Sequence, residues 1–221
     1  MLAMSKNNEI NDALWLRNHA VKNGIPADCV RPYQLLLNQG IGHFQSIIKD
    51  VIKKNGSLID VPMQPKYLEN YLSGYTFEYK TFCNLYEVGG DTEGFWMPSE
   101  TDPKHIVVHF NRCASAGRQR HSQIHELMHF VQTVDPPFLD FMDDLILNTT
   151  LPEYVVVKLL HRLTDKATVM YLMPNDFFRK KYQEIQQTDG VFGDAQLRKL
   201  AQTFDVSMQS VQYRIQECIA N

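Results

Sequence analysis

The sequence predicts a single α+β domain, mainly helical, with a small antiparallel sheet of about three strands. Aromatic and β-branched residues concentrate between Tyr75 and Asn111 in short runs separated by turn residues, which is typical of strands. On both sides of this stretch, apolar residues recur at the three- and four-residue spacing of amphipathic helices. The chain has 221 residues, so one domain with a sizeable core accounts for its length.

The composition is that of an ordinary globular protein, with 44% hydrophobic and 21% charged residues. A formal net charge of −3, from 22 basic and 25 acidic residues, provides no general attraction to nucleic acid or to anionic lipid. No segment approaches the ~20 consecutive apolar residues of a membrane span, and the first residues lack the apolar run of a signal peptide. We therefore expect no membrane partner and no general affinity for nucleic acid.

The cysteines are far apart in the sequence and form no CxxC pair; they are Cys29, Cys83, Cys113 and Cys218. This spacing suggests neither a disulfide framework nor a zinc site built from cysteines. A reducing compartment fits this pattern best, so we predict a cytoplasmic protein whose thiols stay reduced.

Three helical segments are expected before the strands, and none of them carries a motif that indicates chemistry. They are Ile10 to Lys22, Pro32 to Lys53 with an interruption around Gly40-Ile41-Gly42, and Gln64 to Leu72. The interruption is expected because each glycine in a helix costs ~1 kcal/mol relative to alanine.

The strands are expected within Tyr75 to Val88, Gly94 to Met97 and His105 to Asn111, with turn chemistry at Gly89-Gly90-Asp91. A helix with a clear apolar period follows over Ala116 to Thr133, and Pro136-Pro137 ends it. The remaining helical segments are Phe138 to Asn148, Glu153 to Tyr171, Asp176 to Gln187, Asp194 to Phe204 and Ser207 to Ile219.

Residues 125 to 129 read HELMH and match the HExxH pattern. Two histidines four residues apart lie on one face of a helix, so His125 and His129 can bind the same Zn²⁺ ion. Glu126 is offset from that face and can act as a general base on a water at the metal, which is how such sites hydrolyse a peptide bond. The neighbouring side chains are uncharged, which favours a metal site over two surface histidines.

A catalytic zinc site needs a third ligand from the protein. The downstream candidates are several acidic residues and one histidine, namely Asp140, Asp143, Asp144, Glu153, His161 and Asp165. Their positions in the sequence alone do not choose among them.

Four blocks of sequence occur in a fixed order: HIVVHFN, GRQRHSQIHELMHF, YLMPNDFFRK and LRKLAQTFDVSMQSVQYRI. In this order they resemble the ImmA/IrrE family of metallo-endopeptidases. The resemblance implies a zincin-like fold, in which the zinc helix lies next to the sheet and the sheet edge aligns an extended peptide. It also implies a zinc-dependent endopeptidase that cleaves a specific intracellular protein, often a repressor-type transcriptional regulator.

The resemblance also implies a division of the chain and a third ligand. We divide the chain into an N-terminal helical region over 1–74, a zincin-like metallopeptidase core over 75–193 and a C-terminal helical segment over 194–221. Counting back thirteen residues from Pro174 places His161 where the family usually has a glutamate ligand, so a three-histidine site is implied. Asp165 is the alternative third ligand, or else a residue that orients a histidine. Thr164 stands at a position that is usually alanine in the family.

Two functions of other classes stay open. The zinc site could stabilise a sensor or interaction module that performs no catalysis. The closing segment also has helix-turn-helix spacing, with Gln209, Gln212 and Arg214 as its candidate contacts to DNA. Because the segment offers few cations for phosphate groups, packing on the core is its favoured role.

Overall fold

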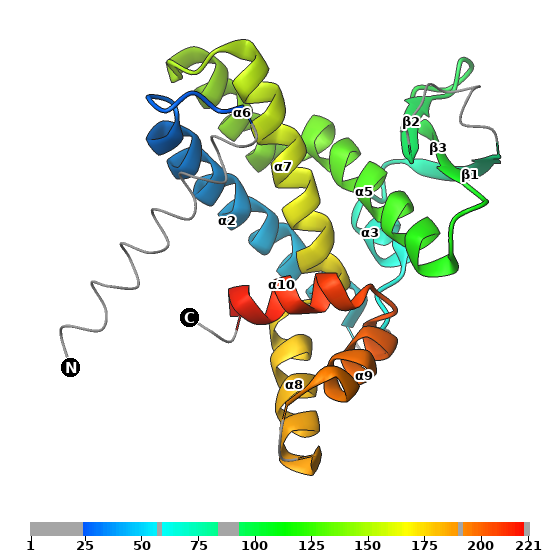
Figure 1. The fold of residues 1–221 in the computed structure, drawn as a ribbon. Coiled ribbons are helices and arrows are strands. Elements are labelled where there is room, and N and C mark those ends of the chain that lie inside the picture. The colour runs from blue at the N-terminus through cyan, green and yellow to red at the C-terminus, as the bar shows by residue number, and fades with distance from the viewer. Residues whose placement is uncertain (1–23, 57–58, 84–92, 190–191, 219–221) are drawn as a thin grey trace.

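A computed structural model describes residues 24–56, 59–83, 93–189 and 192–218 of the chain (Figure 1). The helices of these residues are α2 (Val30–Asn55), α3 (Pro65–Tyr71), α5 (Ala116–Val134), α6 (Pro136–Asn148), α7 (Glu153–Leu172), α8 (Asn175–Asp189), α9 (Asp194–Phe204) and α10 (Met208–Cys218). The strands are β1 (Thr76–Phe82), β2 (Gly94–Pro98) and β3 (His105–Asn111). The helix expected over Ile10 to Lys22 and the turn expected at Gly89-Gly90-Asp91 lie outside the described residues.

The predicted fold class is confirmed, because the described chain is mainly helical with a small three-stranded sheet. The expectation that this sheet is antiparallel is wrong. Strand β3 lies in the centre, pairs antiparallel with β2 and pairs parallel with β1. Consecutive strands are neighbours in most sheets, but here the second strand lies at the opposite edge from the first. Strands β1 and β3 run in the same direction, and β2 runs opposite to both.

Helix α2 continues through the two glycines at which an interruption was expected. A Cβ atom added at Gly40 would lie 2.6 Å from both terminal carbons of Leu163 on α7. Glycine therefore lets α2 and α7 approach each other closely, and the packing offsets its low helix propensity. Gly42 has no such neighbour, since a Cβ there would meet no atom within 4 Å.

The main apolar core lies between α2, α5, α7 and one face of the sheet. Figure 1 shows α5 between the sheet and α7. The ring of Phe130 on α5 meets Tyr75, Phe77 and Trp96 edge-on, with centroid distances of 4.8, 5.8 and 5.0 Å. Edge-to-face aromatic pairs stabilise a contact beyond the area that they bury. Helix α5 is thus fixed against the sheet at the residue that follows His129.

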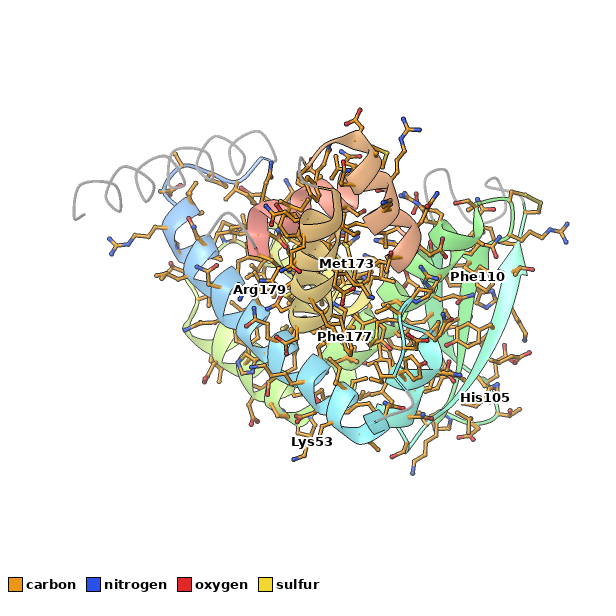
Figure 2. All side chains as sticks on the ribbon, turned by 90° about the horizontal axis from the view of Figure 1, so that it is seen from below. Lys53, His105, Phe110, Met173, Phe177 and Arg179 are labelled. Carbon is orange, nitrogen blue, oxygen red and sulfur yellow. A yellow bond between two sulfur atoms is a disulfide. The ribbon has the colours of Figure 1, made fainter. Side chains whose placement is uncertain are left out.

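Helices α8, α9 and α10 form a second apolar cluster around Met173, which follows the end of α7 (Figure 2). Phe178 of α8 and Phe204 of α9 belong to this cluster. Arg214 on α10 is only 3% exposed. Its guanidinium donates to the Met173 carbonyl at 3.0 Å and pairs with Glu217 at 3.2 Å. Arg214 is the one cation in the sequence of α10, so the only charged member of the three candidate contacts to DNA is used inside the fold, whereas Gln209 and Gln212 are exposed.

Cys83 and Cys113 form a disulfide, so the expectation that the thiols stay reduced is wrong for this pair, whereas Cys29 and Cys218 are free. These cysteines are 30 positions apart in the sequence, and their Cα atoms are 5.9 Å apart. Because β1 and β3 are parallel, both strands end at the same end of the sheet, where Phe82 is aligned with Asn111. The two cysteines follow this last aligned pair and therefore meet.

The proposed division of the chain at residues 74 and 193 stays a prediction. Helix α2 precedes the first boundary and contributes to the same core as α5 and α7. Among the described helices, none combines the length and the apolar composition that crossing a membrane requires.

Candidate metal centre

Helix α5 carries the HELMH motif and is anchored on both sides of it. Near its start, Arg120 donates from Nη1 to Asp205 Oδ2 at 2.7 Å and from Nη2 to the Phe204 carbonyl at 2.9 Å. Gly117 approaches the same turn, since an added Cβ would lie 3.0 Å from the Asp205 carbonyl oxygen. Near its end, Phe130 packs on the sheet. The motif therefore sits on a rigid element, which a precise site requires.

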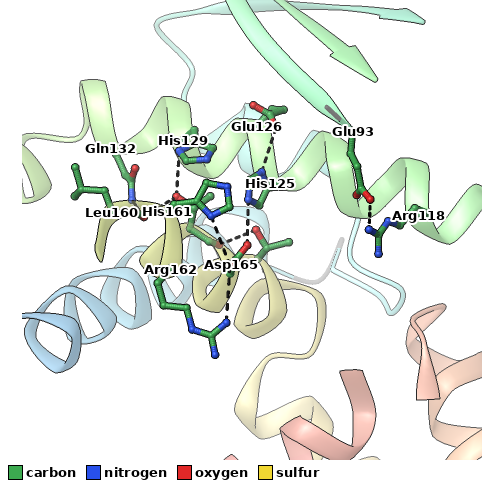
Figure 3. A network of polar contacts seen from close by, with 12 residues as sticks. Glu93, Arg118, His125, Glu126, His129, Gln132, Leu160, His161, Arg162 and Asp165 are labelled. Atoms are coloured by element: carbon green, nitrogen blue, oxygen red, sulfur yellow. Dashed lines mark hydrogen bonds and ion pairs between the residues drawn. The ribbon is translucent and has the colours of Figure 1, made fainter. Parts of the chain in front are cut away.

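Three histidines from two helices come together beside α5 (Figure 3). His125 and His129 of α5 and His161 of α7 each offer one ring nitrogen, and these nitrogens lie within 4.8 Å of one another. The ring centroids are 4.7 Å apart for the α5 pair, and 5.3 and 5.5 Å from His161 to His125 and His129. Within the described residues, the other downstream candidates do not join this group; they are Asp140, Asp143, Asp144, Glu153 and Asp165.

The donor set fits a zinc ion. Three imidazole nitrogens are a common set for catalytic zinc, and tetrahedral coordination with Zn–N of ~2.1 Å places them ~3.4 Å apart. The three histidine nitrogens already lie within 4.8 Å of one another, so they need only a small movement to reach that spacing. The side chain of His161 is 62% exposed, against 14% for His125. This leaves one side open to solvent, as a catalytic site needs for water and substrate.

Glu126 is held between the histidines and strand β2, and it is 7% exposed. Its Oε1 atom lies 3.1 Å from Nδ1 of His125. A Cβ added at Gly94, the first residue of β2, would lie 3.2 Å from Cγ and 3.4 Å from Oε1 of Glu126. Gly94 therefore leaves room for the carboxylate. From the sequence, Gly94 was expected only to begin a strand, although glycine in a strand often marks such a close approach.

Asp165 contacts two of the three histidines. Its Oδ1 lies 3.3 Å from Nε2 of His125, and its Oδ2 lies 3.7 Å from Nδ1 of His161. Burial lowers the pKa of His125, but contacts with Asp165 and Glu126 outweigh it and raise this pKa to about 9. Burial raises the pKa of Asp165, whereas His125 and His161 lower it, and the net result is a lowered value. Asp165 is thus an ionised neighbour that balances the charge of the histidines.

His129 has a different environment from His125. Its Nδ1 lies 3.1 Å from the hydroxyl of Thr164 on α7. Burial, followed by the charge of His125, lowers the pKa of His129 to about 4, so the ring is neutral at pH 7, which is the form that binds a metal. Thr164 is fully buried and was not among the predicted site residues. No sequence pattern indicates this contact, because it depends on how α5 and α7 cross.

His121 lies one turn before His125, and the two rings are stacked with centroids 6.2 Å apart. Burial, followed by the charge of His125, lowers the pKa of His121 to about 4. His121 is therefore half-buried at the edge of the histidine group.

The family model of the IrrE N-terminal-like domain, a metallopeptidase family, matches residues 89–216. Among solved structures, a Mycobacterium tuberculosis transcriptional regulator is similar, with a TM-score of 0.50, 10% sequence identity, and coverage of 83% of this chain and 51% of that one. At this identity the likeness shows the fold alone, and the chain spans about half the length of that protein. No curated protein matches the chain.

The matched family region is more than half of the chain and contains all of α5 and α7. It therefore includes the three histidines and the glutamate that the fold brings together. The chain belongs to the IrrE N-terminal-like domain family of metallopeptidases.

Proposed function

We propose that this chain is a zinc-dependent endopeptidase in which His125, His129 and His161 hold the metal and Glu126 is the general base. The observation that carries the proposal is the meeting of three histidine nitrogens within 4.8 Å, beside a buried glutamate. Imidazole nitrogens favour zinc over hard cations such as magnesium or calcium, and His125, whose pKa is raised, releases its proton when the metal binds. Asp165, which contacts two of the histidines, orients them and compensates their charge.

A bound zinc ion supplies the Lewis acidity that makes a water nucleophilic at neutral pH. Glu126 accepts the proton of the attacking water and transfers it to the leaving amine of the cleaved peptide bond. The low exposure of Glu126 and its contact with β2 at Gly94 hold the carboxylate in one position. Such preorganisation reduces the rearrangement that the reaction needs.

The substrate in this proposal is an extended segment of a specific protein. In the described sheet, β2 is an edge strand, and it begins at Gly94 beside Glu126. A peptide that pairs with the outer edge of β2, which no other described strand covers, would pass its scissile carbonyl close to the general base. We propose a cytoplasmic transcriptional regulator of the repressor type as the substrate. The family resemblance supports this class of substrate.

The experiment compares the full chain with its Glu126→Gln variant. Elemental analysis should find one zinc ion per chain in both proteins, because Glu126 is not a ligand. In a cell extract, new protein N-termini should appear with the wild type and be absent with the variant. A wild type without bound metal, or equal cleavage by both proteins, would refute the proposal. Bound zinc with no cleavage would instead support the non-catalytic sensor.

A further inference from the structure

Thr164 connects a histidine of the metal centre to the backbone of α7. Its Oγ1 lies 3.1 Å from Nδ1 of His129 and 3.1 Å from the carbonyl oxygen of Leu160, one turn earlier in α7. Thr164 is 0% exposed, so water does not compete for these contacts. The hydroxyl is therefore a fixed link between the two helices that carry the histidines.

The hydrogen atoms of this link can be assigned by counting donors and acceptors. A threonine hydroxyl has one hydrogen and two lone pairs. The Leu160 carbonyl can only accept, so the hydroxyl donates its one hydrogen there. Toward His129 the hydroxyl can then only accept, and Nδ1 of His129 must carry the hydrogen. In a neutral imidazole this leaves the lone pair on Nε2, which is the nitrogen free to bind a metal.

The Leu160 carbonyl is itself held in place from α5. The side-chain amide of Gln132 donates to it at 3.1 Å, and Figure 3 shows Gln132 and Leu160 next to His129. Gln132 is 9% exposed. The carbonyl thus accepts from side chains of both helices, which fixes the position of the group to which the Thr164 hydroxyl donates.

We propose that Thr164 is a positioning residue that holds His129 in the tautomer whose Nε2 lone pair faces the metal group. This inference rests on the proposed function, since it concerns the same metal site. A partner behind a metal-binding histidine fixes the tautomer and ring orientation, and its loss typically weakens metal binding by 10- to 100-fold. The sequence offered only the observation that Thr164 stands where the family usually has alanine.

The test uses three variants of the full chain. Thr164→Val keeps the shape and removes the hydroxyl, whereas Thr164→Ser keeps the hydroxyl. Thr168→Val is the matched control, because Thr168 is also 0% exposed on α7 and its hydroxyl donates to a backbone group, the Thr164 carbonyl, at 2.8 Å. Zinc affinity is measured by competition with a chelator. The His129 tautomer is measured in the metal-free protein from ring-nitrogen chemical shifts, assigned by the signal that disappears in His129→Gln.

We expect Thr164→Val to lose zinc affinity by about 10- to 100-fold and to show mixed His129 tautomers, while Thr164→Ser and Thr168→Val stay within about threefold of wild type. Wild-type affinity with an unchanged tautomer in Thr164→Val would overturn the inference. An equal loss in Thr168→Val would also overturn it, since any buried hydroxyl would then have the same effect. If the wild type binds no zinc, the proposed function fails, whereas the tautomer measurement still decides the role of Thr164.

Discussion

The substitution Gly40→Ala should destabilise the protein, although alanine is the better helix former. The added Cβ would lie 2.6 Å from Cδ1 and Cδ2 of Leu163 and 3.2 Å from its Cγ. Carbon atoms in contact normally lie ~3.5–4.0 Å apart, so both methyl groups would have to retreat by about 1 Å. Leu163 is 0% exposed, and a close-packed interior offers no empty space for that movement.

The magnitude is the difference between two opposing terms. Replacing glycine by alanine inside a helix stabilises it by ~1 kcal/mol. Overpacking a core costs ~1–3 kcal/mol, and a clash with two methyl groups of a fully buried leucine belongs in the upper half of that range. We therefore expect the free energy of unfolding to fall by about 1–2 kcal/mol.

Urea unfolding followed by circular dichroism measures this change, and the same helix provides the control. Gly42 is two residues away and exposed, and a Cβ there meets nothing within 4 Å. Gly42→Ala should therefore stabilise the protein by ~0.5–1 kcal/mol. The effects of Gly40→Ala and Leu163→Ala should also be less than additive in the double variant, because the second removes the clashing methyl groups. If Gly40→Ala proved as stabilising as Gly42→Ala, the close packing of α2 on α7 would be refuted.

Three further predictions concern the site and its supports. Gly94→Ala should lower turnover by about tenfold or more through displacement of Glu126 while one zinc per chain stays bound; loss of zinc as well would mean that the whole site had moved. Asp205→Ala should lower the free energy of unfolding by ~1–3 kcal/mol, because it removes a charged hydrogen bond to buried Arg120. In the same urea titration, Asp205→Asn should lower the free energy of unfolding by a smaller amount. Burial, followed by the charge of Lys80, lowers the pKa of His109 in the folded protein. In the unfolded chain the pKa of a histidine is ~6.5, so below this pH the unfolded chain binds a proton that the folded protein does not. The stability of the metal-free wild type should therefore decline more steeply from neutral pH downwards than that of His109→Phe, which keeps the ring stack on Phe95; parallel declines would contradict this.

Helix limits and the HExxH motif could be predicted because they depend on neighbours in the sequence. The helix predicted over Ala116 to Thr133 became α5, Ala116–Val134, and the helix predicted over Glu153 to Tyr171 became α7, Glu153–Leu172. In both cases an apolar period defines the helix, and a proline two residues beyond its last residue marks its end. The histidine pair of α5 follows from helix geometry alone, because a separation of four residues places two side chains on one face.

Features that join distant segments could not be predicted in the same way. The sheet order and the disulfide between Cys83 and Cys113 both depend on β1 pairing with β3, which the alternation of single strands does not encode. The continuity of α2 at Gly40 depends on a leucine far along the chain. The contact of Thr164 with the metal centre likewise depends on the crossing of two helices. In each case tertiary packing decides what local propensity leaves open.

The assignment of His161 as the third ligand depends both on local sequence and on tertiary packing. Its position in the sequence follows from a resemblance, but its approach to the pair on α5 depends on where α7 lies. Helix α7 is held against α2 by Leu163 at Gly40, and against α5 by the Leu160 carbonyl, which accepts from Gln132 at 3.1 Å. Residues 160 to 163 form about one helical turn, so the turn that makes both contacts also presents His161 to the metal centre. Gly40→Ala should therefore weaken zinc binding as well as stability, whereas Gly42→Ala, which leaves α7 in place, should change neither the zinc affinity nor the positions of the histidines.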